Sequence, residues 1–358
     1  MELNTFRDEA LPFGADASGI VLDDDDDVGA TTVKTVAVFF DIGCLRRSYY
    51  IITDMLFPEL APVLRRAAYL FPDDALGRFL KGKHKVREHS LQRIQEVREE
   101  LSRHSTGAAE FEVQSAKQER FLDGSRRQGK GVAPGTFVHA LLQNENRVIG
   151  GRKFTDEEIA TQVFTIMVTG AETTASAITF TLYHVAATPA AEARFLEEVD
   201  TFGRSAVPGY DDLNKFPFLV ACFNEALRLE PSLGLGTIRV CREDTTLCGY
   251  RVPQGTWLNM SQQYYQRDPQ RWEEPDSFRP DRMLQPGATS SPAWTPFGEG
   301  SRSCVGVKLA YAEAVIALVR LYQRFTFNLA PGQVPLKTEA YISHRPKAGV
   351  HVHVCPRQ

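Results

Sequence analysis

The sequence has no excess of basic residues. Its 41 lysines and arginines are outnumbered by 45 aspartates and glutamates, so the net charge is −4 at pH 7. A nucleic-acid partner would require a basic surplus, and we expect none. The 358 residues, 43% of them hydrophobic, are enough for a sizeable buried core.

A secretory leader and long apolar runs are also missing. The chain begins with the acidic, polar stretch Met-Glu-Leu-Asn-Thr-Phe-Arg-Asp-Glu, which is not a signal peptide. No stretch reaches about 18 apolar residues, the length that indicates a membrane-spanning helix. The apolar run from Thr35 to Leu45 is interrupted by Asp41. The sequence therefore predicts core elements and no transmembrane helix.

Cysteine is scarce, and its spacing matches no common structural site. The six cysteines are Cys44, Cys222, Cys241, Cys248, Cys304 and Cys355. None of them forms a C-x-x-C pair, which argues against a structural zinc site. Six cysteines in a chain of this length do not make a disulfide scaffold. We expect free thiols in a reducing compartment, one of which can have a special role.

The first part of the chain predicts helices joined by surface segments. We expect two helices within residues 33–66, broken near Pro58. Residues 81–104 predict one amphipathic helix, because apolar residues recur there every three to five positions. The five aspartates at 23–27 indicate a solvated loop, with a cation site as the weaker alternative. Residues 105–135 predict a mobile surface connection.

A long helix is the clearest element of the sequence. Thr155 is followed three residues later by Glu158, which is a capping-box pattern, and the apolar run then continues to about Ala187. Pro189 marks its end or the start of the next helix. At 1.5 Å per residue such a helix is roughly 45 Å long. An element of that length has to cross a whole domain.

The rest of the chain changes from helices to short strands and back. We expect helices at residues 190–200 and 217–230, hairpin strands within 238–260, a proline-rich loop at 267–300, a last helix from Cys304 to Phe325, and short strands within 326–354. The predicted fold class is therefore mainly α with a small β portion.

Cys304 stands in the patterned segment Phe297-Gly-Glu-Gly-Ser-Arg-Ser-Cys-Val-Gly306. Glycines such as Gly298 and Gly306 allow a tight loop whose backbone can approach a flat ligand. Cys304 lies at the N-terminal end of the last predicted helix, where free N–H groups and the helix dipole favour thiolate over thiol. A thiolate is a strong electron-donating ligand for iron. Arg302 can pair with a carboxylate of such a cofactor, and Phe297 can keep water from the sulfur.

Two further segments accompany this loop. The first is Asn224-Glu-Ala-Leu-Arg-Leu-Glu-Pro231, in which Glu225 and Arg228 share one helix face and can pair. The second is Phe278-Arg-Pro-Asp-Arg-Met283. With the Cys304 loop, these segments resemble the E-x-x-R helix, the F-x-P-E-R-F segment and the haem loop of the cytochrome P450 family.

The resemblance implies roles for these residues. Cys304 would ligate the haem iron, and Glu225, Arg228 and Arg282 would form a buried charged lock on the proximal side of the haem. Two departures from the family pattern, an aspartate at 281 for glutamate and a methionine at 283 for phenylalanine, are mild.

The long helix contains Thr169-Gly-Ala-Glu-Thr-Thr174, which is similar to the oxygen-binding motif of the family except that Thr169 replaces a small residue. The resemblance implies that Thr173 hydrogen-bonds the iron-bound dioxygen and that Glu172 supplies protons through water. Gly170 would leave room beside the iron. A threonine-rich core helix is the alternative that the residues alone leave open.

Other positions are implied to contact the haem or the substrate. Arg239, within Ile238–Asp244, matches a strand that places a basic residue on a haem propionate, and an ordinary surface charge is the alternative. Gln266 replaces the histidine of the family's H-R-D-P turn, which removes the basis for a propionate contact there. Residues 231–237 and 341–342 would line the substrate pocket, and their leucines and isoleucine indicate an apolar substrate.

The resemblance is strong for residues 150–355, the expected haem-binding catalytic core. It is loose for residues 1–150, which would match the middle helices of the family. We expect a single domain over residues 1–358, with a cytochrome P450-like fold that lacks its N-terminal strands and first helices. Either Met1 is an internal start or the chain is truncated.

The function implied by the resemblance is that of a haem-thiolate monooxygenase with haem b (iron protoporphyrin IX) as cofactor. It would use O₂ and two electrons from an NADPH-dependent P450 reductase or a ferredoxin-type donor to insert one oxygen atom into a small lipophilic substrate. One alternative is a haem-thiolate isomerase or lyase that rearranges peroxides, against which Glu172 and Thr173 argue. Another is a truncated, non-catalytic fragment. Full-length eukaryotic relatives are anchored in the endoplasmic reticulum membrane; this sequence shows no anchor, and its location is left open.

Overall fold

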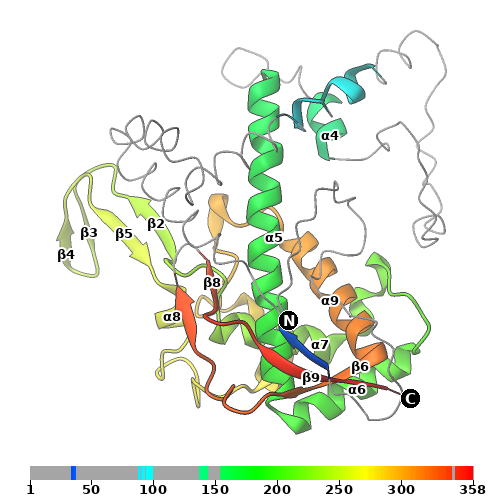
Figure 1. Cartoon of the computed structure of the whole chain (residues 1–358). Helices are drawn as coiled ribbons and strands as arrows, with labels where there is room; N and C mark the ends of the chain where they lie inside the picture. Colours follow the sequence, from blue (N-terminus) through cyan, green and yellow to red (C-terminus); the bar gives the residue numbers. More distant parts are fainter. Residues whose placement is uncertain are drawn as a thin grey trace, which may run out of the picture. The chain divides into compact units, whose positions relative to one another are not determined.

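The computed structural model describes residues 34–37, 88, 90–92, 94–99, 137–143, 154–340 and 343–357 (Figure 1). The chain forms two compact units. In the part that the structure describes, the first unit contains residues 34–37 and everything from Gly170 onward, and the second contains the described residues from 88 to Thr169.

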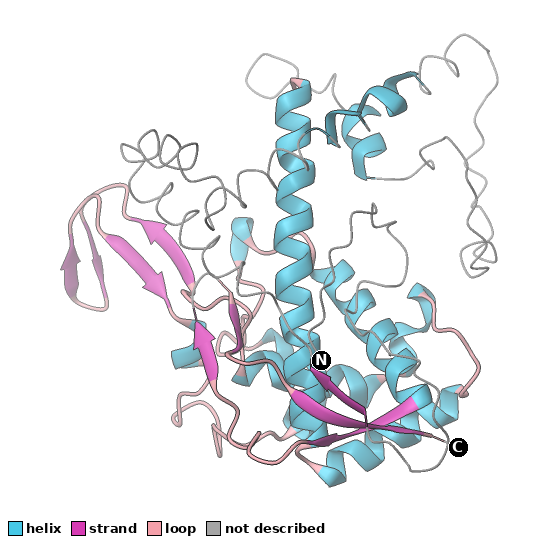
Figure 2. Ribbon diagram, in the orientation of Figure 1, coloured by secondary structure: helices cyan, strands magenta, loops and turns pink. Residues whose placement is uncertain are grey.

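Helices dominate both units, and the strands form small sheets, as the sequence predicts (Figure 2). The α-helices are α4 (Phe137–Gln143), α5 (Asp156–Ala186), α6 (Pro189–Phe202), α7 (Pro217–Leu229), α8 (Gln262–Tyr265) and α9 (Val307–Arg324). The strands are β1 (Lys34–Ala37), β2 (Thr237–Val240), β3 (Thr245–Leu247), β4 (Tyr250–Val252), β5 (Trp257–Met260), β6 (Phe325–Leu329), β7 (Thr338–Ala340), β8 (His344–Pro346) and β9 (His351–Pro356). Short 3₁₀ turns interrupt the loop-rich stretch before α9, among them η3 (Pro280–Leu284) and η5 (Gly300–Arg302).

Helix α5 begins as its capping box predicts. The Thr155 backbone N–H donates to the Glu158 carboxylate at 2.9 Å, and the Glu158 N–H donates to the Thr155 hydroxyl at 3.2 Å. Three acidic residues in the first turn, Asp156 to Glu158, favour the positive end of the helix dipole. The helix ends at Ala186, just before Pro189 starts α6.

By length and composition, α5 is the one helix among the described residues that could cross a membrane. Its C-terminal half is nevertheless largely enclosed by protein. Phe180, Leu182 and Val185 are buried, and Leu182 and Val185 belong to the main core cluster together with residues of α6, α7 and α9. These contacts make the second half of α5 a core helix.

The main core lies between helices and the sheet β1–β9–β6. The Phe195 ring of α6 lies 4.6 Å from that of Tyr322 on α9, and Tyr322 meets Phe327 of β6 at 5.1 Å between centroids. Strand β9 alternates, with Val352 and Val354 buried. This alternation is what places one face of a strand on a core.

Strand β1 corrects one prediction from the sequence. Residues 34–37 were expected to lie in a helix, but they pair antiparallel with β9, with Lys34 opposite Val354 and Ala37 opposite His351 (Figure 1). A free edge of β9 supplies ladder hydrogen bonds to this segment, whose Thr35 and Val36 are β-branched and suit a strand. Residues 38–66, where the two helices were predicted, lie outside the described residues.

The second unit contains the segment for which the sequence predicts an amphipathic helix, residues 81–104. The described residues between 88 and 99 are helical, and Ile94 and Val97 are buried against Leu142 of α4 and Ile159 of α5. The amphipathic helix predicted there is confirmed over those residues. The aspartate run at 23–27 and residues 105–135 lie outside the described part of the chain.

The predicted hairpins between 238 and 260 are confirmed. Strand β2 pairs antiparallel with β5, and β3 pairs with β4. Gly236, directly before β2, has a φ of +73°, and a Cβ built there would lie 2.5 Å from the Met260 carbonyl oxygen. Only glycine allows the backbone before β2 to come this close to Met260 at the end of β5. This close contact fixes where β2, the strand that carries Arg239, begins.

The Gly236→Ala substitution is therefore expected to destabilise the protein by about 3 kcal/mol, since it adds a clash to the ordinary cost of about 1–2 kcal/mol for a left-handed non-glycine residue. Gly255→Ala is the matched control: its φ is +84°, but a Cβ there meets nothing within 4 Å. Denaturant unfolding of both variants measures the difference. Equal losses of stability would show that the contact with Met260 has no part in it.

Candidate haem-thiolate site

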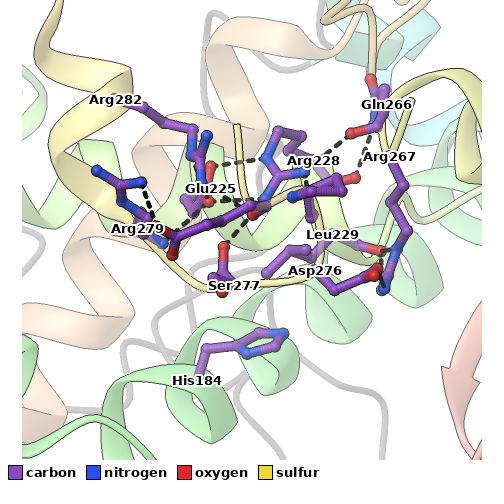
Figure 3. A network of polar contacts seen from close by, with 12 residues as sticks. His184, Glu225, Arg228, Leu229, Gln266, Arg267, Asp276, Ser277, Arg279 and Arg282 are labelled. Atoms are coloured by element: carbon purple, nitrogen blue, oxygen red, sulfur yellow. Dashed lines mark hydrogen bonds and ion pairs between the residues drawn. The ribbon is translucent and has the colours of Figure 1, made fainter. Parts of the chain in front are cut away.

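Helix α7 carries a fully buried ion pair (Figure 3). Arg228 Nε donates to Glu225 Oε2 at 2.9 Å, and Arg228 Nη2 donates to Glu225 Oε1 at 2.8 Å. Both side chains have no exposed surface. The predicted pairing is thus present, in the bidentate geometry that makes arginine–carboxylate hydrogen bonds strong.

The other donors of Arg228 are satisfied by backbone carbonyls. Nη1 donates to the carbonyls of Gln266 and Pro275 at 2.9 and 2.7 Å, and Nη2 donates to that of Ser277 at 3.2 Å. A guanidinium has five N–H groups, and all five find acceptors here. The pair therefore fastens the loop of residues 266–277 to α7 (Figure 3).

A second arginine completes the lock. Arg282, on η3, donates from Nε to Glu225 Oε1 at 3.0 Å, and the backbone N–H of Arg279 donates to the same oxygen at 3.0 Å. The guanidiniums of Arg228 and Arg282 lie 5.1 and 5.8 Å from the Trp272 ring, close enough for cation–π attraction. One carboxylate thus joins α7, η3 and the intervening loop.

The two departures noted beside Arg282 are accommodated locally. The Asp281 side chain is exposed and pairs with Arg194 at 2.7 Å, outside the lock. Met283 is buried in a cluster with Trp272 and Trp294. Asp281 keeps an acidic side chain on the surface, and Met283 keeps an apolar side chain in the core.

Glu225→Gln should lower the free energy of unfolding by about 3–5 kcal/mol, because it leaves the buried guanidinium of Arg228 and the half-buried one of Arg282 without their carboxylate. The matched control is Asp281→Asn, which removes an exposed ion pair and should cost less than about 1 kcal/mol. Urea unfolding of the two variants compares them. If Glu225→Gln lowers the free energy of unfolding by less than about 1 kcal/mol, the lock contributes little to stability.

The Cys304 loop is closed by backbone hydrogen bonds. The Cys304 N–H donates to the Phe297 carbonyl at 2.9 Å, and the Ser303 N–H donates to that of Gly300 at 3.1 Å. Gly298 and Gly300 have φ values of +70° and +76°, which L side chains rarely adopt. The predicted tight, glycine-dependent turn is present.

The thiol of Cys304 is exposed and held by the backbone. The N–H of Gly306 donates to Sγ at 3.3 Å, and α9 begins one residue later at Val307. The predicted helix start at Cys304 was three residues early. The apolar side chains of Val305 and Leu309 beside it are 89% and 53% exposed. A donor sulfur beside uncovered apolar side chains suits a large flat apolar ligand.

Phe297 lies behind the loop. Its ring lies 5.7 Å from that of Tyr311 on α9, and it packs on the cluster of Ala177 from α5, Phe223 from α7 and Ala314 from α9. The same core cluster thus reaches the Cys304 loop and three helices.

Asn224, adjacent to Glu225, has a role that the sequence did not reveal. Its side-chain oxygen accepts from the Tyr311 hydroxyl at 2.6 Å, and its carbonyl accepts from the Trp294 indole at 3.1 Å. Burial raises the pKa of the Tyr311 hydroxyl well above its usual range. Asn224 therefore fixes α7 to α9 and to the chain entering the loop. A buried asparagine in an apolar helix was the available signal.

Gln266 also has a structural role in place of the histidine that the family pattern would have. Its Nε2 donates to the carbonyls of Leu227 and Arg228 at 3.1 and 3.2 Å, and its Oε1 accepts the Thr295 N–H at 2.9 Å. The side chain is fully buried. Both of its polar atoms are used within the protein, so none is left for a propionate.

The two arginines proposed for carboxylates are both exposed. Arg239 donates from Nη1 to the neighbouring Ile238 carbonyl at 2.9 Å and forms no ion pair with the described acidic side chains. Within the described chain, Arg302 on η5 forms no ion pair with an acidic side chain. Each guanidinium can therefore take up an anionic group of a ligand. Leu233 is half-buried and Leu235 exposed, whereas Tyr341 and Ile342, also predicted to line the pocket, lie outside the described residues.

On α5, the predicted oxygen-site residues lie in the first unit. The Glu172 carboxylate accepts a hydrogen bond from the Ser343 hydroxyl at 2.5 Å, and the Thr173 carbonyl accepts one from Ser232 at 3.1 Å. A Cβ added at Gly170 would meet no heavy atom within 4 Å. Packing among the described residues therefore leaves space at Gly170, and its role beside a ligand stays a prediction.

A polar cluster at the end of α7 was missed by sequence reasoning. The Glu230 carboxylate lies 3.0 Å from Arg267 Nη2, 3.5 Å from His344 Nε2 and 3.9 Å from His184 Nε2. His184 stacks on Phe278 at 4.9 Å. No cluster of metal-ligating side chains is present among the described residues. These contacts join residues far apart in the chain, and no local sequence pattern predicts them.

Burial dominates the titration of this cluster. It lowers the pKa of His184 from 6.5 to about 3, with Arg267 and Arg228 adding to the effect, and that of His344 from 6.5 to about 4. It raises the pKa of Glu230 from 4.5 to about 7, against the attraction of Arg267. Both imidazoles are neutral at pH 7.

Each imidazole binds fewer protons in the folded than in the unfolded chain, so its contribution to stability, complete above pH 6.5, is lost as the pH falls towards 4. Glu230 acts in the opposite sense between about pH 4.5 and 7. The two imidazoles together lose more stability than Glu230 gains, so the free energy of unfolding should fall on acidification.

His344→Gln should flatten this loss in thermal unfolding between pH 6.5 and 4.5, whereas His351→Gln, outside the cluster, should not. Parallel pH curves for His344→Gln and the parent protein would contradict the argument.

Comparison with known proteins gives one consistent result. A family model described as cytochrome P450 matches residues 49–352. The chain is 34% identical to cytochrome P450 3A6 of Oryctolagus cuniculus over 231 residues, covering 63% of this chain and 45% of that protein. It is 28% identical to cytochrome P450 3A5 of Homo sapiens over 291 residues, covering 80% of this chain and 51% of that protein.

Solved structures agree with the sequence comparison. A zebra fish cytochrome P450 determined with progesterone superposes with a TM-score of 0.55 at 29% identity, over 61% of this chain and 50% of that one. The crystal structure of a cytochrome P450 named CYP102L1 gives a TM-score of 0.53 at 30% identity, over 58% of this chain and 47% of that one. The chain spans about half the length of the curated relatives it matches.

Proposed function

The chain belongs to the cytochrome P450 family, and on that premise we propose that it is a haem-thiolate monooxygenase with Cys304 as the iron ligand. The observation that carries the proposal is the exposed Cys304 thiol, held by the Gly306 N–H at 3.3 Å at the start of α9. The proposed haem-binding core comprises residues 150–355.

The donor set suits haem b. Cys304 offers one sulfur, and Gly306, where a Cβ would lie 3.7 Å from that sulfur, keeps a side chain away from it. Arg302 and Arg239 would hold the two carboxylates of the cofactor by charge-assisted hydrogen bonds. Phe297, packed against α9, would screen the sulfur from water.

Haem b, when bound, supplies the iron at which O₂ is activated. On α5, Gly170 would leave space, the Thr173 hydroxyl would orient the oxygen substrate, and the Glu172 carboxyl would hold the proton that the reaction consumes. Overall, substrate, O₂, two electrons and two protons give a hydroxylated product and water. Electrons would come from an NADPH-dependent reductase or a ferredoxin-type donor on the Cys304 side.

A small lipophilic substrate is proposed because Leu233 and Leu235 lie in the segment between α7 and β2. The zebra fish relative was solved with progesterone, so progesterone is a reasonable first probe. An acid and a hydroxyl at 172 and 173 favour O₂ chemistry over peroxide rearrangement, which can proceed without a proton relay.

The test is haem uptake. The protein mixed with haem, reduced and exposed to carbon monoxide should show the Soret shift of a thiolate-ligated haem, because Cys304 supplies the sulfur. Cys304→Ser should abolish this spectrum. Cys248→Ser, which removes another exposed thiol, should leave it unchanged. A parent protein that takes up no haem would overturn the proposal and favour a non-catalytic fragment.

A further inference from the structure

Three serine hydroxyls join one stretch of α5 to two other segments of the first unit. The Ser343 hydroxyl donates to Glu172 Oε1 at 2.5 Å, and the Ser232 hydroxyl donates to the Thr173 carbonyl at 3.1 Å. The Ser176 hydroxyl donates to the carbonyl of His344. Of these three bonds, the one from Ser343 ends on an ionisable side chain.

The segments that carry these serines are themselves joined. Leu233 forms an antiparallel β-bridge with Ser343, and the His344 N–H donates to the Ser232 carbonyl at 2.9 Å. Ser232, Ser343 and His344 are all buried. The backbone at Ser343 is therefore held from both sides, and its hydroxyl is presented to α5 from a fixed position.

Among the described residues, the Ser343 hydroxyl is the one hydrogen-bond partner of the Glu172 carboxylate. Within the residues that the structure describes, no lysine, arginine or histidine forms an ion pair with Glu172. Elsewhere on α5, Thr161, Thr165 and Thr169 donate back to carbonyls of the helix itself. A free glutamate side chain visits several rotamers, and ordering it costs entropy. The Ser343 hydroxyl selects one of them.

We propose that Ser343 is the positioning residue for Glu172, holding its carboxyl group where it can pass a proton towards the Thr173 position. The inference rests on the proposed function. A hydroxyl suits this task because it can donate to a carboxylate and can also accept from a carboxylic acid. Glu172 can then both give and regain a proton.

Cumene hydroperoxide gives a test that needs neither a known substrate nor a redox partner. Heterolytic cleavage of its O–O bond at a haem-thiolate site would release an alkoxide, which takes up a proton and becomes cumyl alcohol. Homolytic cleavage gives an alkoxyl radical, which loses a methyl radical and becomes acetophenone. The ratio of the two products therefore reports how well a proton is delivered.

Ser343→Ala should raise the acetophenone-to-alcohol ratio about tenfold, as expected for a misplaced acid. Ser343→Thr, which keeps the hydroxyl, should restore the parent ratio, and Ser343→Cys should lie between. Ser176→Ala is the matched control, since it removes a buried hydroxyl bond between the same segments without touching an acid. The C–O stretching frequency of the carbon monoxide adduct should shift in Ser343→Ala and Glu172→Gln but not in Ser176→Ala.

The outcomes separate the two proposals. A parent protein without a thiolate-type carbon monoxide spectrum overturns the proposed function. A normal spectrum with an unchanged product ratio and stretching frequency in Ser343→Ala overturns the positioning role alone. Equal effects in Ser176→Ala also overturn it, because general loosening of the segments would then suffice. In a Glu172→Gln background, Ser343→Ala should add nothing further, and an additive effect contradicts coupling through the acid.

Discussion

A buried guanidinium is tolerated only where every N–H finds an acceptor, and Arg228 meets that condition with one carboxylate and three backbone carbonyls. The requirement fixes more than a pair of charges. The carbonyls belong to Gln266, Pro275 and Ser277, so the loop that contains them must keep one course along α7. Leaving Arg228 partly unpaired would cost several kcal/mol, a large fraction of the stability of an ordinary domain.

The position of the Cys304 loop follows from this constraint. Gln266, whose carbonyl accepts from Arg228, also binds the Thr295 N–H through its side chain. The Gln262 amide donates to the Thr295 carbonyl at 3.1 Å, and the Tyr265 hydroxyl bonds the Thr295 hydroxyl. Thr295 stands two residues before Phe297, where the loop begins. A continuous set of contacts therefore runs from the buried ion pair to the start of the loop that presents the thiol.

Much of this arrangement could be predicted from the sequence, because it depends on the spacing of residues within short segments. The capping box at Thr155, the Glu225–Arg228 pair and the glycines around Cys304 are each contained within a few residues. Strand β1 could not be predicted, because its conformation is set by pairing with β9 at the opposite end of the chain. The Ser343–Glu172 bond and the contacts of Glu230 were missed for the same reason. Gln266 replaces the histidine of the family pattern, so the sequence predicts that a propionate contact is lost there. Only the structure shows that the amide bonds backbone groups of the protein instead.

The amide of Gln266 has one more consequence. An imidazole at this position would change its charge and its donor pattern near neutral pH, whereas an amide keeps one acceptor and two donors at every pH at which the protein folds. The hydrogen bonds by which the Gln266 amide connects α7 to the chain before the thiol loop therefore do not change with pH. The titrating groups are instead Glu230, His184 and His344, which make no hydrogen bond to the thiol loop among the described residues. Acidity can weaken the fold there while the bonds that aim the sulfur stay unaltered, so the ligand geometry and the overall stability of this chain can respond to protons independently.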